Sequence, residues 1–311
     1  MSGRMYAALL VSTGLLTIAA ADAVDAQQPT LRLVLESERA GYELGEPVYL
    51  IARLRNDGPA PARVLGLLNP SDGLLVVSIT GPGAEGVGFV PLSVRDTDAM
   101  PITIPPGGQI AKAFQVFFGG TGWVFRRPGT YTATATFTIH DGSGGGPRDV
   151  RSETLSIRVG DRPEIAGVLM SNSAASREAG QFMVWSEGDH LTEGLALLAT
   201  LPNRFAASPV VDHYRLALGR SLARPFKDYR RGTVRPAAFD RAVAELERVR
   251  DDVLPSYQRV QKQLALANAY RSLGRQADTA RTTTAARTLI AARPELVEFQ
   301  EQLARTAPPA R

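Results

Sequence analysis

The densest group of side chains able to bind an anion lies between Arg215 and Arg241. This window holds eight basic side chains and only two acidic ones, Asp228 and Asp240. Two of its arginines are four residues apart and share one face of an expected helix. Converging guanidinium groups bind carboxylate or phosphate through charge-assisted hydrogen bonds. The pattern predicts a surface for an anionic ligand or partner, although a solvated cationic face is the commoner outcome of such a run. The candidates are Arg220, Arg224, Lys227, Arg230 and Arg231.

Trp123 is the second candidate contact. It follows a glycine-rich turn in the segment GGTGWVF. A tryptophan at a loop serves as a surface anchor for carbohydrate or peptide, and the commoner role is packing in the core of a β-sheet domain. Both roles remain open from the sequence.

Signatures of catalysis and of metal binding are missing from the sequence. The three histidines, His140, His190 and His213, each neighbour an aspartate, but adjacent residues point in different directions and cannot chelate together. No H-x-x-x-H, G-x-S-x-G or S-x-x-K spacing occurs. We therefore expect no catalytic residue, no metal and no cofactor. One enzymatic alternative is an acidic cluster of Glu187, Asp189 and His190.

The N-terminus has the pattern of a secretory signal peptide. Arg4 precedes an apolar run from Met5 to Ala21, and small residues up to Ala26 suit cleavage there. We expect residues 1–26 to be removed, leaving no transmembrane segment; an uncleaved anchor is the alternative. The chain contains no cysteine, so export without disulfides points to a bacterial periplasm or exterior.

The chain divides near residues 161–163. Residues 27–160 carry 12 basic and 12 acidic groups, whereas residues 161–311 carry 22 and 17. Arginine outnumbers lysine 32 to 3, which is typical of a GC-rich genome and is no argument for nucleic acid as a partner. Two domains are expected, residues 27–160 and 161–311.

The first domain has the period-two alternation of β-strands, interrupted by glycine and proline turns. The segment from Gly41 to Asn56 shows it well, because Val48, Leu50 and Leu54 fall on one side of the expected strand. Eight strands are predicted, at residues 31–36, 48–55, 62–67, 74–80, 102–104, 110–117, 130–139 and 150–159. Their spacing favours an antiparallel sandwich.

Three motifs carry a resemblance to a known fold. They are Y-x-L-G-E-P-V with L-x-N at residues 42–56, P-P-G-G at 105–108 and P-G-T-Y-T-A-x-A at 128–135. This part resembles the immunoglobulin-like sandwich domains of secreted bacterial proteins, and it is also similar to strands of the intracellular proteinase inhibitor family. The second resemblance implies inhibition of a protease as an alternative function.

The second domain has helical periodicity, and the expected fold is an all-α array of helical hairpins. Ser208 before Pro209 predicts a helix start, as an N-cap followed by a first-turn proline. Helices are predicted at residues 174–185, 191–201, 209–224, 236–253, 256–273, 276–292 and 294–305. The segment 264–294 is similar to a tetratricopeptide repeat, with Leu266, Tyr270 and Gly274 in its first helix and turn.

These patterns together predict a multi-domain protein, β then α, that acts by binding. We expect an exported interaction protein whose partner is a protein or peptide, because both architectures serve as interaction modules. The alternatives are the proteinase inhibitor and an accessory subunit of an envelope enzyme. The sequence carries no signal for the oligomeric state.

Overall fold

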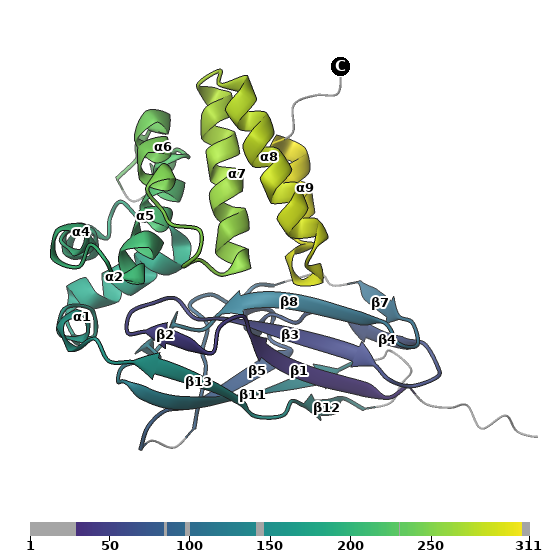
Figure 1. Ribbon diagram of the computed structural model, residues 1–311. Coiled ribbons are helices and arrows are strands. Elements are labelled where there is room, and N and C mark those ends of the chain that lie inside the picture. Colours follow the sequence, from purple (N-terminus) through teal and green to yellow (C-terminus); the bar gives the residue numbers. More distant parts are fainter. Residues whose placement is uncertain (1–28, 84–85, 97–99, 141–145, 230, 307–311) are drawn as a thin grey trace, which may run out of the picture.

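The protein is described here by a computed structural model covering residues 29–83, 86–96, 100–140, 146–229 and 231–306. The predicted signal peptide, residues 1–26, lies outside the described residues, as does Arg230. The structure confirms an N-terminal β-rich region followed by a helical C-terminal region (Figure 1).

The β-rich region contains β-strands from residue 31 to residue 160. They are β1 (Leu31–Ser37), β2 (Gly41–Glu43), β3 (Tyr49–Asn56), β4 (Ala62–Leu65), β5 (Leu75–Thr80), β6 (Val87–Gly88), β7 (Pro101–Ile104), β8 (Gln109–Gln115), β9 (Phe118–Gly119), β10 (Gly122–Trp123), β11 (Gly129–Ile139), β12 (Arg148–Arg151) and β13 (Leu155–Gly160). A short 3-10 turn, η1 (Pro70–Asp72), precedes β5.

Two sheets form the layers of this region. One has the order β1-β3-β8 and is antiparallel throughout, and the other has the order β2-β13-β11-β5-β6, with β12 paired to β11. Only the pair of β13 with β2 is parallel among the described strands. The core lies between the layers, where Leu50 and Leu54 of β3 and Ala135 and Phe137 of β11 are fully buried.

The first half of strand β3 is buried on both faces, whereas Arg55 near its end is exposed. The alternation predicted one apolar face, and Leu50 and Leu54 do point into the core. Tyr49 and Ile51 on the opposite face are also buried, because the helical region covers that face. The sequence predicted a strand buried on one face only. The second face is buried because the helical region packs against it.

The predicted strand at residues 150–159 is wrong in one respect: the structure divides it into β12 and β13. Between the two pairings with β11, three residues oppose two, which is a β-bulge. The Ser152 hydroxyl accepts a hydrogen bond from the Ala135 amide at 2.9 Å and donates one to the Glu153 carbonyl. These bonds satisfy the Ala135 amide and the Glu153 carbonyl at the point where the ladder is interrupted.

The helical region begins directly after β13. Its helices are α1 (Pro163–Leu169), α2 (Ala174–Trp185), α3 (Thr192–Ala199), α4 (Leu201–Arg204), α5 (Pro209–Leu222), α6 (Phe239–Glu247), α7 (Ser256–Ser272), α8 (Gln276–Ala291) and α9 (Phe299–Thr306), with a 3-10 turn η2 (Pro294–Leu296) before α9. Ser208 caps α5 as predicted, because its hydroxyl accepts a hydrogen bond from the Val210 amide.

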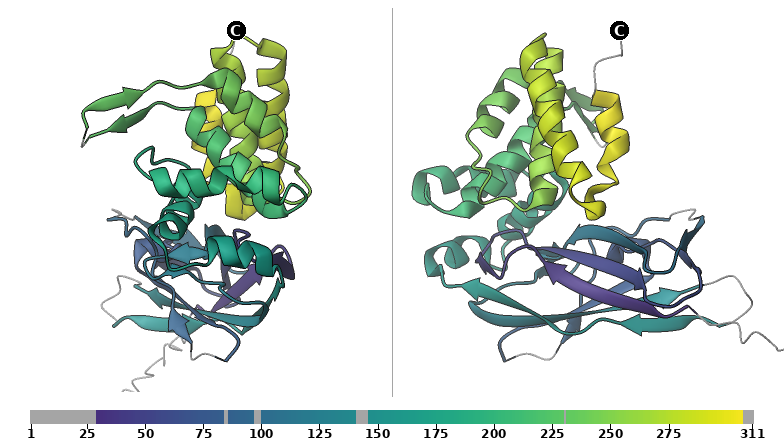
Figure 2. Two further views of the ribbon diagram at one scale, coloured as in Figure 1. Left: turned by 90° about the vertical axis from the view of Figure 1, so that its left-hand side faces the viewer. Right: turned by 45° about the vertical axis from the view of Figure 1, so that its right-hand side comes forward.

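The expectation of an all-α region is corrected by a β-hairpin of β14 (Phe226–Asp228) and β15 (Thr233–Arg235). Figure 2 shows it extending away from the helices in the left view. The hairpin directly precedes the predicted helix 236–253. In the structure that helix is shorter and corresponds to α6. Arg235, the last residue of β15, donates hydrogen bonds to the Ser221 carbonyl and to Asp189, so it anchors the base of the hairpin.

The helices stand on the outer face of the sheet β1-β3-β8, with the ends of α7 and α9 nearest to it (Figures 1 and 2). Tyr49 of β3 stacks on Tyr257 of α7 at a centroid distance of 5.1 Å. Arg53 pairs with Glu295 at 3.1 Å, and Lys112 pairs with Glu298. The two regions are therefore joined by apolar packing and ion pairs along one sheet face.

Candidate functional site

Two of the predicted arginines lie close together at the C-terminal end of α5. Arg220 lies in the last turn, and Arg224 follows two residues after the helix ends. The Arg220 guanidinium donates a hydrogen bond to the Ser186 hydroxyl at 2.8 Å, and Arg224 donates to the Ser186 carbonyl at 2.8 Å. Both arginines are thus held by the C-terminal end of α2.

These two arginines line a groove of about 540 Å³ between α5, α7 and α9. We call it the arginine groove, defined by Arg220, Arg224, Tyr257, Gln261, Asn268, Arg271, Glu298 and Arg305. Four of these side chains are cationic and one is acidic. The single acid, Glu298, is already paired with Lys112 of β8. Two of the four arginines pair with acids outside the lining, Arg224 with Glu187 and Arg305 with Glu301, which leaves Arg220 and Arg271 as the unneutralised cations of the groove.

Three buried polar atoms of the groove have no hydrogen-bond partner among the described protein groups. They are one donor, Nε of Arg224, and two acceptors, Oε1 of Gln261 and Oε1 of Glu298. A buried polar atom without a partner costs about 1–3 kcal/mol of folding free energy, so it is uncommon in a folded chain. Three of the five such atoms in the described residues lie in this groove, and the other two are Arg259 Nε and Thr283 Oγ1.

Arg220 lies at the inner end of this groove, beside two tyrosines. Burial lowers the pKa of its guanidinium, and no carboxylate of a described residue lies within 4.0 Å of it. Burial also raises the pKa of the Tyr49 phenol to about 12, and it raises the pKa of Tyr257. Both phenols are therefore neutral at ordinary pH and can serve as hydrogen-bond donors.

A smaller hollow of about 240 Å³ adjoins the arginine groove. Tyr257 and Gln261 line both of them, and the remaining walls of the hollow come from β3, β8, β9, α2, residues 89–95 and the η1 turn with Asn69. Trp185, which is 36% exposed, stands at this hollow. The arginine groove is thus continued toward the junction with the β-rich region.

A second polar cluster lies where the same two regions meet. We call it the junction cluster: Arg39, Glu46, His213 and Gln258. Glu46, in the turn before β3, accepts hydrogen bonds from the Glu43 amide at 2.8 Å and from Arg39. His213 of α5 lies with Nε2 3.3 Å from Glu46 Oε1 and Nδ1 2.6 Å from Gln258 Oε1.

The centre of the junction cluster is closed to solvent, whereas the Arg39 side chain at its edge is 32% exposed. Glu46 is 2% exposed and His213 is 1% exposed. Burial acts to raise the pKa of the Glu46 carboxyl, but His213, Arg39 and the Glu43 amide outweigh it and hold that pKa below its ordinary value. The carboxylate is therefore stabilised as an anion, and the cluster ties the β2–β3 turn to α5 and α7.

The remaining predicted cationic residues lie apart from the arginine groove. Lys227 is exposed on the β14–β15 hairpin, with its ammonium 4.7 Å from the centre of the Tyr229 ring. Arg231, in the turn of that hairpin, lies 3.8 Å from Asp228. Arg230 lies outside the described residues. The structure brings Arg220 and Arg224 together and separates them from Lys227 and Arg231.

The residues of the enzymatic alternative do not converge on one another. Glu187 pairs with Arg224 at 3.2 Å, and Asp189 pairs with Arg235 at 2.6 Å. His190 stacks on the Phe226 ring at a centroid distance of 6.2 Å. Each side chain thus has its own partner in the helical region.

Trp123 lies at the contact between the two regions. It is 7% exposed, and its indole N–H donates to the Ser176 carbonyl and hydroxyl of α2, both at 3.2 Å. The ring also packs edge-on against Phe118 at a centroid distance of 5.3 Å. One side of the ring lines a separate cavity in the β-rich region.

Six of the eight residues that define the arginine groove were missed in the sequence. Arg271 of α7, and Glu298 and Arg305 next to or in α9, lie 47 or more residues beyond Arg224. The sequence did indicate a polar face on α7, since Asn268 and Arg271 are three residues apart and lie on the same side of that helix. Nothing local relates α7 and α9 to α5, because that relation comes from how the helices pack.

Metal binding and membrane insertion have no support in the described residues. In that part of the chain, no group of three or more His, Asp or Glu side chains is arranged to hold a metal ion. None of the described helices is long and apolar enough to cross a membrane.

Comparisons with known proteins match only part of the chain. No model of a protein family matches, and no curated protein matches. Solved structures similar to part of it include the CARDB domain of the PF1109 protein from Pyrococcus furiosus, with 11% identity, a TM-score of 0.25, and coverage of 43% of this chain and 96% of that one.

Two further solved structures show similar coverage. The sporulation control protein Spo0M from Bacillus subtilis has 15% identity and a TM-score of 0.26, over 45% of this chain and 53% of that chain. A β-glucosidase from Listeria innocua has 12% identity and a TM-score of 0.24, over 43% of this chain; the match spans only 16% of the enzyme. TM-scores this low carry no argument about function.

Proposed function

We propose that this protein is an exported, non-catalytic binding protein of the bacterial envelope, and that its arginine groove holds an extended acidic segment of a partner protein. The observation that carries the proposal is the gathering of three unpartnered buried polar atoms among four arginines in one groove. Export is supported by the pattern of residues 1–26 and by the absence of cysteine.

The groove needs a ligand with three chemical features. It must accept a hydrogen bond from Arg224 Nε and donate to Gln261 and Glu298, and it must carry negative charge for the arginines. An extended peptide main chain has both N–H donors and C=O acceptors, and acidic side chains add the charge. Sulfate and chloride have no donor, and hydrogen phosphate has one O–H for the two acceptors, whereas an extended main chain offers several N–H groups, so the peptide fits the groove better.

The proposal also includes the finer identity of the two regions. The two-layered β-rich region is an immunoglobulin-like sandwich, as the turn and strand motifs at residues 42–56 and 128–135 suggest. The pair α7 and α8 is a tetratricopeptide-like hairpin, supported by Gly274, whose φ of 73° ends α7 in the left-handed region. In this view the sandwich supports the helices and closes one end of the groove.

A peptide-binding measurement tests the proposal. The chain of residues 27–311 is titrated into fluorescein-labelled heptaglutamate, with labelled heptaglutamine as the uncharged probe, and anisotropy is recorded. We expect saturable binding of heptaglutamate, at least about tenfold tighter than that of heptaglutamine, because charge-assisted hydrogen bonds contribute about 1.5–3 kcal/mol each.

The matched variants are Arg271→Gln in the groove and Arg287→Gln outside it. Arg287 is exposed on α8 and does not line the groove, so its loss removes the same charge without touching the site. Arg271→Gln is expected to weaken heptaglutamate about tenfold, and Arg287→Gln less than twofold. Equal losses in both variants, or no saturable binding, would show that the groove is not the site.

A further inference from the structure

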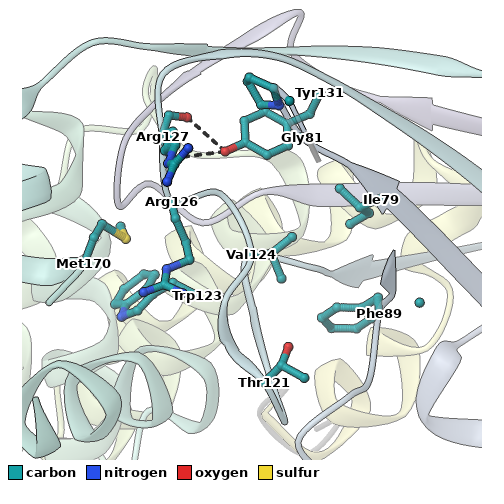
Figure 3. A pocket seen from close by; sticks show the side chains of 13 residues that line it. Ile79, Gly81, Phe89, Thr121, Trp123, Val124, Arg126, Arg127, Tyr131 and Met170 are labelled. Carbon is teal, nitrogen blue, oxygen red and sulfur yellow. Dashed lines mark hydrogen bonds between the residues drawn. The ribbon is translucent and has the colours of Figure 1, made fainter. Parts of the chain in front are cut away.

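A second cavity lies outside the arginine groove, on the β-rich region. Its volume is about 690 Å³, in the range of pockets that take small molecules. None of its 13 lining residues lines the arginine groove. Figure 3 shows Ile79 and Phe89 along one side of it, Trp123 and Met170 along the other, and Tyr131 with Arg127 at one end.

The walls of this cavity are apolar although several of the side chains carry polar groups. The indole N–H of Trp123 is already bonded to Ser176, so the ring offers apolar surface to the cavity. The Tyr131 hydroxyl donates to the Arg127 carbonyl at 2.9 Å and accepts from the Arg127 amide at 3.1 Å. Phe89, Val124 and Met170 add further apolar surface. The body of a ligand here would be buried against rings and aliphatic groups.

The only charged residues among those that line the cavity are two neighbouring arginines. Arg126 and Arg127 are both exposed, and neither has a carboxylate of a described residue within 4.0 Å. Arg126 donates a hydrogen bond to the Asn172 side chain, which leaves further N–H groups for a ligand. The cavity thus combines apolar walls with a cationic rim that lacks a counter-charge in the described protein.

Gly81, Pro82 and Gly83 border the cavity. A Cβ on Gly81 would lie 2.6 Å from the Tyr131 ring, so only glycine allows that close approach. A Cβ on Gly83 would meet nothing within 4 Å, which marks open space beside the cavity.

We propose that this cavity binds a monomeric amphiphilic anion, with its apolar chain or ring between Phe89, Val124 and Trp123 and its carboxylate or sulfate head at Arg126 and Arg127. The charge argument selects an acid over a neutral amphiphile, because a bidentate arginine contact needs an anionic head. This ligand differs in chemistry from the acidic peptide of the arginine groove, so the two proposals stand separately.

Tryptophan fluorescence tests the site with decanoate as the probe and 1-decanol as its neutral counterpart. The chain of residues 27–311 carries Trp185→Phe, so that Trp123 is the one reporter. Decanoate below its micelle concentration is expected to change Trp123 emission saturably. Decanol is expected to bind about tenfold more weakly, as loss of a charge-assisted contact predicts.

Two variants locate the binding. Arg126→Gln with Arg127→Gln is expected to weaken decanoate about tenfold and to leave decanol unchanged, whereas Arg148→Gln, exposed on β12, leaves both unchanged. Val124→Phe fills the cavity and is expected to abolish binding of both probes.

The unfolding midpoint of each variant is measured in parallel. If Val124→Phe fails to fold, the comparison of the double arginine variant with Arg148→Gln still decides whether the site binds decanoate. The proposal is overturned if decanol binds as tightly as decanoate, if the double arginine variant keeps full decanoate affinity, or if the folded Val124→Phe variant still binds. Binding of decanoate only as vesicles or micelles would equally count against a monomeric site.

Discussion

The junction cluster lies where the two regions meet, the arginine groove lies within the helical region, and the two differ in how their buried polar groups are paired. In the junction cluster both oxygens of Glu46 and both ring nitrogens of His213 have partners. In the arginine groove, Arg224, Gln261 and Glu298 each leave a buried atom without a partner. Complete pairing suits a structural joint, whereas incomplete pairing suits a site whose partner is a ligand.

The difference predicts the largest effect at Glu46. Replacing Glu46 by alanine leaves His213 and the Glu43 amide without this acceptor, and leaves Arg39 with the Val253 carbonyl alone. We expect a loss of about 3–5 kcal/mol in the free energy of unfolding, as for breaking a buried ion pair. Urea unfolding measures it, with Glu153→Ala on an exposed loop as the control. A loss below about 1 kcal/mol would contradict a structural role.

The same cluster predicts how stability depends on pH. The pKa of Glu46 is lower in the folded chain than in the unfolded chain, so its contribution is complete above the ordinary glutamate pKa and is lost as pH falls through the folded value. Glu46→Gln removes this titration. The difference in unfolding free energy between the natural chain and Glu46→Gln should therefore shrink on acidification, and a difference independent of pH would speak against an ionised Glu46.

A smaller effect is expected in the arginine groove. Gln261→Leu removes a buried acceptor that has no partner and keeps a similar side-chain volume. We expect the unfolding free energy to stay the same or to rise by up to about 1 kcal/mol, because no hydrogen bond is lost. Heptaglutamate binding should weaken in the same variant. A loss of stability comparable to that of Glu46→Ala would remove the contrast between the two clusters.

The smallest effect is expected on the β14–β15 hairpin. Lys227 and Arg231 are exposed, and the Arg231 ion pair with Asp228 is long at 3.8 Å. Replacing both by glutamine should change the unfolding free energy by less than about 0.5 kcal/mol and heptaglutamate affinity by less than about twofold. A loss of affinity as large as that of Arg271→Gln would make the hairpin part of the binding site.

Much of the local structure could be predicted. Helix α2 was predicted with both ends correct, and the N-cap at Ser208 was recognised. Period-two and helical patterns are encoded within a few residues, which explains this success. Helix α1 and the β14–β15 hairpin were missed. The hairpin has no alternating apolar residues, and its base is held by Arg235 and Asp189 rather than by its own pattern.

The sequence by itself determined the order of the two regions, the faces of the main strands, and the closeness of Arg220 to Arg224. It left Glu46 without an assigned role, because its partner His213 lies 167 residues away. Only the tertiary structure decided that α7 and α9 complete the arginine groove and that Lys227 and Arg231 stand apart from it. Contacts between distant segments depend on how packed elements bury their surfaces, and a local residue pattern carries no record of that arrangement.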